Sequence, residues 1–125
     1  MIFPEQRMEV WLCTEPTDMR KQFDGLSAMV KHQLKEDPLS GQLFVFINRR
    51  RTQMKVLYFD RSGYCIWSKR LVQGQFHHRS SPSGKQSLDW LQLKLLIEGI
   101  EIEKRHQYKR FDRDQWAASV KSLHG

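Results

Sequence analysis

The chain has 125 residues, of which 39% are hydrophobic and 28% are charged, and this composition is typical of a globular domain rather than a disordered segment. No apolar run approaches the roughly 20 residues that a membrane-spanning helix needs, and the first residues lack the basic and apolar regions of a secretory signal, so we expect a cytoplasmic protein with no membrane partner. The formal net charge of +7 and the pI of about 9.7 favour an anionic partner.

A strand and a long helix are the first predicted elements. Glu9–Cys13 is a short apolar run of the kind that forms a strand, and Pro16 interrupts it because proline cannot donate to a strand ladder. Thr17 or Asp18 then offers an N-cap oxygen, and apolar residues recur at helical spacing up to Leu34. The sequence therefore predicts a helix that begins at this cap and continues to Leu34.

Three further strands are predicted as a meander. The apolar runs are Leu43–Ile47, Lys55–Phe59 and Tyr64–Leu71, and the segments between them are short and polar. Turns of this length join antiparallel neighbours. The first run is apolar without alternation, which indicates that both of its faces are covered, one by the long helix and the other by a second helix or a second subunit.

The remainder of the chain is predicted to be mainly helical. After a loop over residues 77–86, Ser87 is expected to cap a helix over Leu88–Glu98, and Gly99 is expected to close it. The predicted fold class is α+β, with an antiparallel meander of three to four strands, a long helix after the first strand and C-terminal helices. We expect residues 1–111 to form one domain and residues 112–125 to form a helical tail.

The positive charge is concentrated in the predicted meander. Nine basic residues and one acidic residue lie between Phe44 and Lys85, whereas the rest of the chain holds 12 basic and 13 acidic residues. Three arginines occupy the first turn, and guanidinium groups bind phosphate in a bidentate fork. An exposed charged hairpin that only protects the sheet edge is the alternative interpretation. The predicted DNA-binding residues are Arg49, Arg50, Arg51, Lys55, Arg61, Lys69 and Arg70, with a secondary patch of Lys104, Arg105, Lys109 and Arg110.

Other chemistry is not favoured by the residue pattern. The adjacent pair His77 and His78 would point to opposite faces of a strand, and no further ligands have zinc-site spacing, so we expect no metal and no cofactor. Cys13 and Cys65 lie in apolar runs and are predicted to be free structural thiols. The carboxylates are isolated from one another, so an enzyme is not expected, and a metal-dependent nuclease is the least favoured function.

Several motifs resemble those of a known family. Residues 17–26 read TDMRKQFDGL, which resembles the TDMRKxFDGL signature of the small accessory proteins called TnpB, from one family of multi-gene bacterial insertion sequences. The resemblance continues through NRRR at residues 48–51, KRL at residues 69–71 and LLIEGI at residues 95–100, and it covers roughly residues 8–111. It implies a non-catalytic helper that is encoded beside a separate transposase and needed for efficient movement of the element.

Two functional hypotheses follow, and they differ in the partner that the protein contacts. In the first, the basic meander binds DNA, and contact with about five phosphates predicts a slope near −4.5 for log K against log salt. In the second, the protein is an adaptor that docks on the transposase through the apolar helix at residues 88–98, without direct DNA contact. Its anchors would be Trp90, Leu93 and Ile97. A homo-oligomer is compatible with both hypotheses.

Overall fold

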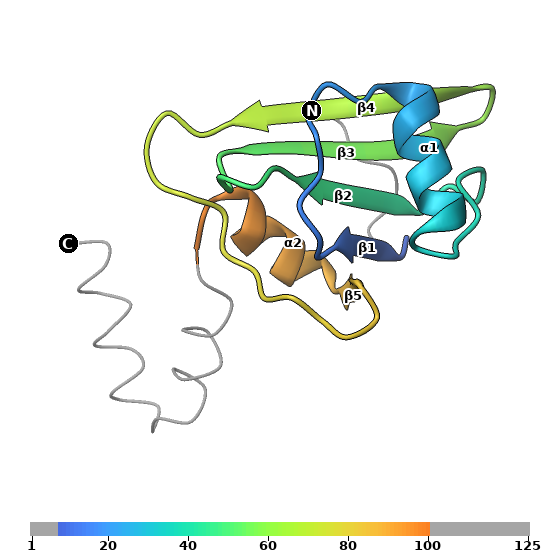
Figure 1. The fold of residues 1–125 in the computed structure, drawn as a ribbon. Coiled ribbons are helices and arrows are strands. Elements are labelled where there is room, and N and C mark those ends of the chain that lie inside the picture. Colours follow the sequence, from blue (N-terminus) through green and yellow to red (C-terminus); the bar gives the residue numbers. More distant parts are fainter. Residues whose placement is uncertain (1–7, 101–125) are drawn as a thin grey trace.

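The computed structural model describes residues 8–100, which form a five-stranded sheet flanked by two helices (Figure 1). This arrangement confirms the α+β class. The strands lie in the order β4-β3-β2-β1-β5. In chain order the elements are β1 (Val10–Cys13), α1 (Phe23–His32), β2 (Leu43–Ile47), β3 (Gln53–Asp60), β4 (Gly63–Arg70), β5 (Lys85–Leu88) and α2 (Trp90–Ile97).

The predicted meander is confirmed in β2, β3 and β4. β3 runs antiparallel to β2, with Phe44 opposite Leu57, and antiparallel to β4, with Val56 opposite Trp67. Because β3 and β4 have eight residues each, their hairpin reaches from one end of the sheet to the other. The turn that holds Arg49–Arg51 and the turn that holds Arg61 therefore lie at opposite ends of the sheet.

The prediction of a purely antiparallel sheet of three to four strands is wrong at β1 and β5. β1 lies parallel to β2, with Val10 opposite Leu43, because the chain crosses over through α1 between the two strands. β5 pairs antiparallel with β1 in a segment where the sequence predicts a loop and the start of a helix. The four residues of β5 read KQSL and carry no apolar alternation, so their strand conformation depends on the free edge of β1 rather than on local propensity.

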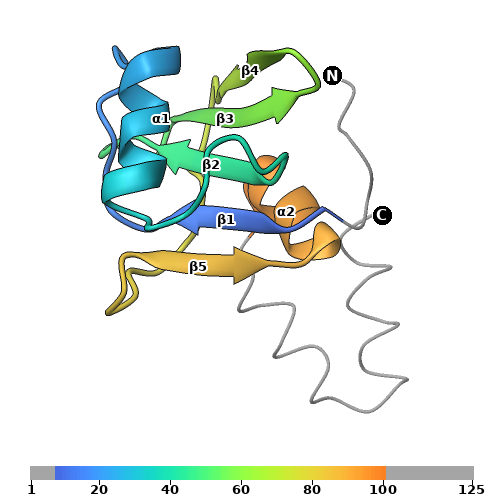
Figure 2. The same cartoon turned by 90° about the vertical axis from the view of Figure 1, so that its right-hand side faces the viewer.

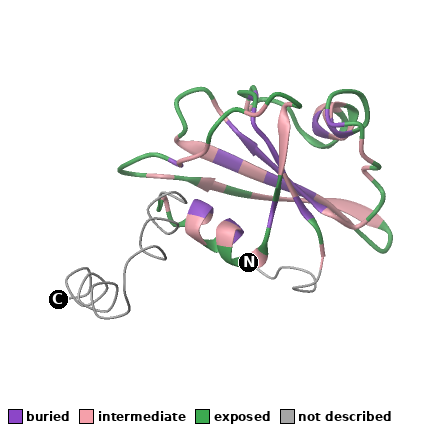
Figure 3. Ribbon diagram, turned by 90° about the horizontal axis from the view of Figure 1, so that it is seen from below, coloured by how far each residue is buried: buried purple, intermediate pink, exposed green. Residues whose placement is uncertain are grey.

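The two helices cover opposite faces of the sheet (Figures 2 and 3). All five residues of β2 are buried, which confirms the prediction that both of its faces are covered. Phe44 and Phe46 pack with Leu26 and Val30 of α1, whereas the alternate residues of β2 pack on the other face with residues of α2. A second helix, rather than a second subunit, thus covers the second face of β2.

α1 begins later than the sequence predicts. Asp18 does not cap it, because its carboxylate accepts hydrogen bonds from the backbone N–H and the guanidinium of Arg20. Thr17 is buried, and its N–H donates to the carbonyl oxygen of Ile47 at 2.9 Å, so this segment stays extended beside the end of β2. The helix starts only at Phe23 and has ten residues.

α2 begins at Trp90 rather than Leu88, and its two ends are well capped. The cap is Asp89 rather than Ser87, and it forms a capping box with Gln92. At the other end Gly99 has a φ of +78°, as its predicted closing role requires, and the backbone bonds of a Schellman motif end the helix. No helix within residues 8–100 is long and apolar enough to cross a bilayer.

Candidate nucleic-acid interface

Arg49–Arg51, here called the arginine turn, connects β2 to β3 on a backbone held by one asparagine. Asn48 accepts the N–H of Arg51 at its carbonyl oxygen, at 3.0 Å. Its side-chain oxygen accepts the N–H groups of Thr52 and Gln53 at 2.8 and 3.0 Å. The side-chain oxygen of Asn48 therefore accepts two backbone N–H groups of the turn and takes the place of a backbone carbonyl as their acceptor. The turn needs none of its arginine side chains for its own fold.

A second segment braces the arginine turn from outside. Residues 71–76, here called the outer loop, follow β4 and lie at the same end of the sheet as the turn (Figure 1). The N–H of Leu71 donates to the carbonyl oxygen of Thr52 at 2.8 Å, and the N–H of Phe76 donates to that of Arg51 at 2.7 Å. The side-chain amide of Gln75 donates to the carbonyl oxygen of Arg50 at 2.9 Å. Turn and loop thus form one hydrogen-bonded unit.

The guanidinium groups of the arginine turn face solvent. Arg49, Arg50 and Arg51 are all exposed, and within residues 8–100 no carboxylate lies within ion-pair distance of them. Arg70 is also exposed, and it sits at the end of β4 opposite Gln53, next to the turn. Four guanidinium groups therefore share one end of the sheet. Repulsion between such groups is relieved by water or by a bound anion.

Two of the predicted DNA-binding lysines are committed to internal hydrogen bonds. The ammonium group of Lys55 donates to the carbonyl oxygen of Lys21 at 2.8 Å and ties the segment before α1 to β3. That of Lys69 donates to the carbonyl oxygen of Ile97 at 2.9 Å, at the C-terminal end of α2, where the helix dipole favours a cation. Both side chains are partly buried. The prediction that they extend the phosphate-binding surface misses these roles.

The remaining predicted arginine lies elsewhere. Arg61 occupies the turn between β3 and β4, at the opposite end of the hairpin from Arg70. Seven steps along a strand separate the two ends by about 24 Å, at roughly 3.4 Å per residue. Arg61 therefore does not belong to the surface around the arginine turn. Lys104, Arg105, Lys109 and Arg110, together with the tail at 112–125, lie outside the described residues.

A histidine that the sequence did not single out for this site lies beside the turn. His78 follows the outer loop, and its Nδ1 atom is buried without a hydrogen-bond partner in the described part of the chain. Burial lowers the pKa of this imidazole, the polar backbone of Arg79 partly opposes the effect although it makes no hydrogen bond to Nδ1, and the nearby charge of Arg51 lowers the pKa further. The imidazole of His78 is therefore harder to protonate than that of an unperturbed histidine.

The anchors predicted for protein docking are largely internal. Leu93 is only 1% exposed and belongs to the core between α2 and the sheet, so it is unavailable to a partner. Trp90 and Ile97 are partly buried against the same core. The exposed apolar residues near this helix are instead Leu91 and Ile100. The sequence cannot separate the buried side of this short helix from its solvent side, because every position is apolar except Gln92 and Lys94.

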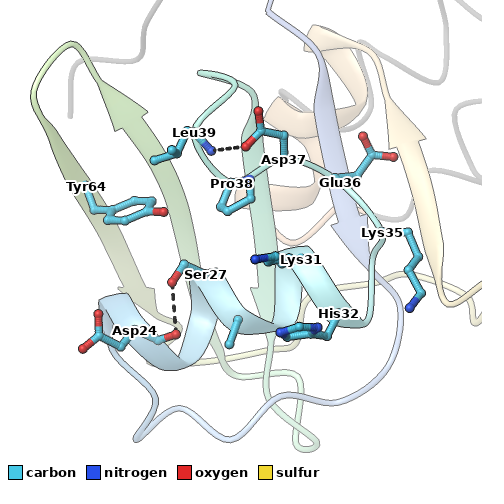
Figure 4. Close-up of a pocket in the computed structure, with 11 residues that line it drawn as sticks. Asp24, Ser27, Lys31, His32, Lys35, Glu36, Asp37, Pro38, Leu39 and Tyr64 are labelled. Carbon is cyan, nitrogen blue, oxygen red and sulfur yellow. Dashed lines mark hydrogen bonds between the residues drawn. The ribbon is translucent and has the colours of Figure 1, made fainter.

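An open groove lies beside α1, between this helix, residues 35–39 and Tyr64 of β4 (Figure 4). It is lined by Lys31, His32 and Asp37 among other residues of both charges, with Tyr64 and Leu39 at its sides. No group of histidine, cysteine or carboxylate side chains within residues 8–100 is arranged to hold a metal ion. The mixed charges give the groove no preference for a phosphate.

The two cysteines are free, as the sequence predicts. Cys13 is buried against α1, and burial raises the pKa of its thiol. Cys65 lies on β4 and is partly exposed. The two thiols are thus in different environments, and neither contributes to the surface around the arginine turn.

Comparison with known proteins gives one family and two relatives. The profile of the family described as "IS66 Orf2 like protein" matches residues 8–107. The protein y4hO of Sinorhizobium fredii is 40% identical over 96 residues, which are 77% of this chain and 84% of that protein. The protein y4jC of the same organism is 31% identical over 101 residues, which are 81% and 86% of the two chains. Both relatives are described as uncharacterized. No solved structure matches the chain significantly.

Proposed function

The chain belongs to the IS66 Orf2-like family, and on this basis we propose that it is an accessory protein of DNA transposition that binds duplex DNA through the arginine turn. The family is an accessory family of an insertion sequence and is not a known catalytic family. We infer that such a protein acts at DNA that the transposase must find, hold or bend. Binding to the phosphate backbone is the simplest contribution that a basic surface can make there.

The rigid backbone of the arginine turn is the main support for this proposal. Three exposed guanidinium groups stand on a turn that Asn48 holds from inside and the outer loop holds from outside. A braced turn loses little backbone entropy when it binds, so more of the energy of each phosphate contact appears as affinity. Arg70 extends the same group by a fourth guanidinium. A merely solvated hairpin needs no such bracing.

The salt dependence of binding tests the proposal. Duplex DNA releases about 0.9 counterions for each phosphate that the protein neutralises, so four guanidinium groups give a slope near −3.6 for log K against log salt. We expect the triple variant Arg49→Ala, Arg50→Ala, Arg51→Ala to bind random duplexes more weakly and to have a slope about 2.7 units smaller. Fluorescence anisotropy with a labelled 25-base-pair duplex from roughly 50 to 300 mM salt measures both quantities.

Arg61→Ala is the matched control for this experiment. It removes the same side chain from an equally exposed turn of the same meander, but at the far end of the β3–β4 hairpin. We expect its salt slope to equal that of the parent protein. Equal slopes for the triple variant and the parent would show that the arginine turn does not contact DNA.

A second function, docking on the transposase through α2, is favoured by the exposed side chains near this helix. Leu91 is 46% exposed and Ile100 is 48% exposed, although both are aliphatic. We expect Leu91→Glu to reduce retention of the cognate transposase on the immobilised protein in the absence of DNA, with Leu39→Glu, on the loop before β2, as the control. Equal retention by the two variants would exclude this face.

A further inference from the structure

The tip of the outer loop projects from the molecule beside the arginine turn. Val72 is 104% exposed relative to a fully accessible valine, and Gln73 and Gly74 are exposed as well. Gly74 has a φ of +84° with open space around it, so the backbone rather than crowding calls for glycine there. The tip therefore consists of one aliphatic and one amide side chain that touch little of the protein itself.

The two ends of this tip are fixed. Leu71 donates its N–H to Thr52 on one side, and Phe76, which is fully buried, donates its N–H to Arg51 on the other. Between them, Gln75 donates to Arg50. An exposed valine alone needs no explanation. A valine held at a fixed position next to four guanidinium groups is different, because whatever polyanion those groups bind is brought against it.

The chemistry of the tip matches one edge of duplex DNA. In the major groove, adenine offers N7 as acceptor and its N6 amino group as donor, and a side-chain amide meets both at once. Thymine offers its C5 methyl group in the same groove, where an aliphatic side chain makes apolar contact. The minor groove presents neither pattern. Gln73 makes no hydrogen bond with any residue of the described chain, so its amide is available for this pairing.

We propose that Val72 and Gln73 enter the major groove and read an A·T base pair, while the arginine turn binds the flanking phosphates. This inference rests on the proposed DNA binding and adds sequence preference to it. In this division of labour the guanidinium groups fix position on any duplex, and the tip of the outer loop distinguishes one duplex from another.

Selection from a random duplex pool tests the preference first. The full-length protein is used to enrich bound 25-base-pair duplexes over several rounds, in parallel with Val72→Ala, Gln73→Ala and the double variant. We expect the parent protein to enrich at least one A·T position, with a preference of about 5- to 150-fold for adenine over other bases. Gln73→Ala should lose that preference and still bind the random pool as well as the parent protein.

Base analogues then identify the groups that are read. Replacement of adenine by 7-deazaadenine removes the N7 acceptor, and we expect this change to weaken the parent protein and leave Gln73→Ala unaffected. Replacement of thymine by deoxyuridine removes one methyl group, which should weaken the parent protein by about fourfold and weaken Val72→Ala less. Leu39→Ala, an exposed aliphatic residue before β2, is the control and should respond to both analogues as the parent protein does.

The outcomes separate this inference from the proposed function. If the parent protein binds with a steep salt dependence but enriches no sequence, or if Gln73→Ala keeps the adenine preference, the reading role of the tip is wrong and phosphate binding stands. If the triple arginine variant binds as the parent protein does, the proposed function is wrong, and the inference about the tip falls with it. We expect Val72→Ala and Gln73→Ala to keep the melting temperature of the parent protein, because both side chains are exposed. Thermal unfolding of each variant checks that a change in binding does not come from a loss of folding.

Discussion

Arg51 and Arg61 are both arginines in the left-handed backbone region, with φ angles of +61° and +53°, and they lie at opposite ends of the sheet. A side chain with a Cβ atom costs roughly 1 to 2 kcal/mol in this conformation, whereas glycine adopts it freely. At both positions the chain therefore carries an arginine where glycine would be more stable. Comparing glycine substitutions at the two positions separates the contribution of the Arg51 guanidinium to DNA binding from the effect of the backbone strain on stability.

We expect Arg51→Gly to stabilise the fold and weaken DNA binding. The free energy of unfolding should rise by up to about 1 kcal/mol. Glycine removes the backbone strain, but it also increases the conformational entropy of the unfolded chain, which offsets part of the gain. The salt slope of DNA binding should fall by about 0.9 units. Urea denaturation and anisotropy titration measure the two effects.

Arg61→Gly is the control for this trade between stability and binding. It should gain a similar stability and keep the salt slope of the parent protein, since its guanidinium lies far from the arginine turn. A loss of binding by Arg61→Gly equal to that of Arg51→Gly would contradict the placement of the interface at one end of the sheet.

His78 gives the fold a specific response to acid. Its pKa is lower in the folded state than the unfolded value near 6.5, so the unfolded chain takes up the proton more readily. Stability is therefore complete above the unfolded pKa and falls as the pH drops below about 6.5 toward the folded pKa. When the pH changes from 7.5 to 5.5, we expect the melting temperature of His78→Gln to fall by less than that of the parent protein.

At the level of residues, the sequence identifies the basic side chains but not their partners. Counting charge finds Lys55 and Lys69 as readily as the arginines, yet both ammonium groups donate to backbone carbonyls of distant segments. These carbonyls belong to Lys21 and Ile97, which lie 34 and 28 residues away in the chain. No local pattern indicates such contacts. The arginine turn is predictable because its turn residues and its charge are adjacent in the sequence.

At the level of elements, Lys69 links β4 to the end of α2. Because successive side chains of a strand point to opposite faces, we expect its neighbour Arg70 to point to the other face of the sheet. We expect Lys69→Met to lower the free energy of unfolding by about 0.5 to 1 kcal/mol, because the last carbonyl groups of α2 lose a cation. Its salt slope of DNA binding should stay unchanged. Arg70→Met should do the reverse, with little effect on stability and a slope about 0.9 units smaller.

This pair of variants is measured by urea denaturation and by anisotropy under the same buffers. A smaller salt slope for Lys69→Met would mean that its ammonium leaves Ile97 for phosphate when DNA binds. In that case the phosphate-binding surface would extend to the face of the sheet that α2 covers.

The limits of sequence reasoning at this level are visible in α1 and β5. The helical periodicity that starts near Met19 is real, but Thr17 is held by Ile47 and Asp18 is occupied by Arg20, so the first residues stay extended. β5 has no strand signal of its own and forms because it completes β1. In both cases a partner distant in the sequence overrides the local preference. β2, β3 and β4 are predictable because their apolar runs and short turns are contiguous.

At the level of the whole molecule, stability depends on the central strands, which both helices cover. Phe44 of β2 is fully buried against α1. We expect Phe44→Ala to cost about 3 to 5 kcal/mol, because it removes an aromatic side chain and leaves a cavity. Denaturation by urea measures the loss. Phe23→Ala, at a phenylalanine that is 44% exposed at the start of α1, should cost much less.

The position of β1 between β2 and β5 has a consequence for synthesis on the ribosome. The nascent chain can form β1 through β4 once Arg70 has emerged, but the second edge of β1 stays open until Leu88 follows. At about 5 to 20 residues per second, this interval lasts roughly 1 to 4 seconds. During that time the backbone groups of Val10–Cys13 form an unprotected edge to which another polypeptide can add a strand. Translational pausing in this interval would convert a folding intermediate into a seed for aggregation.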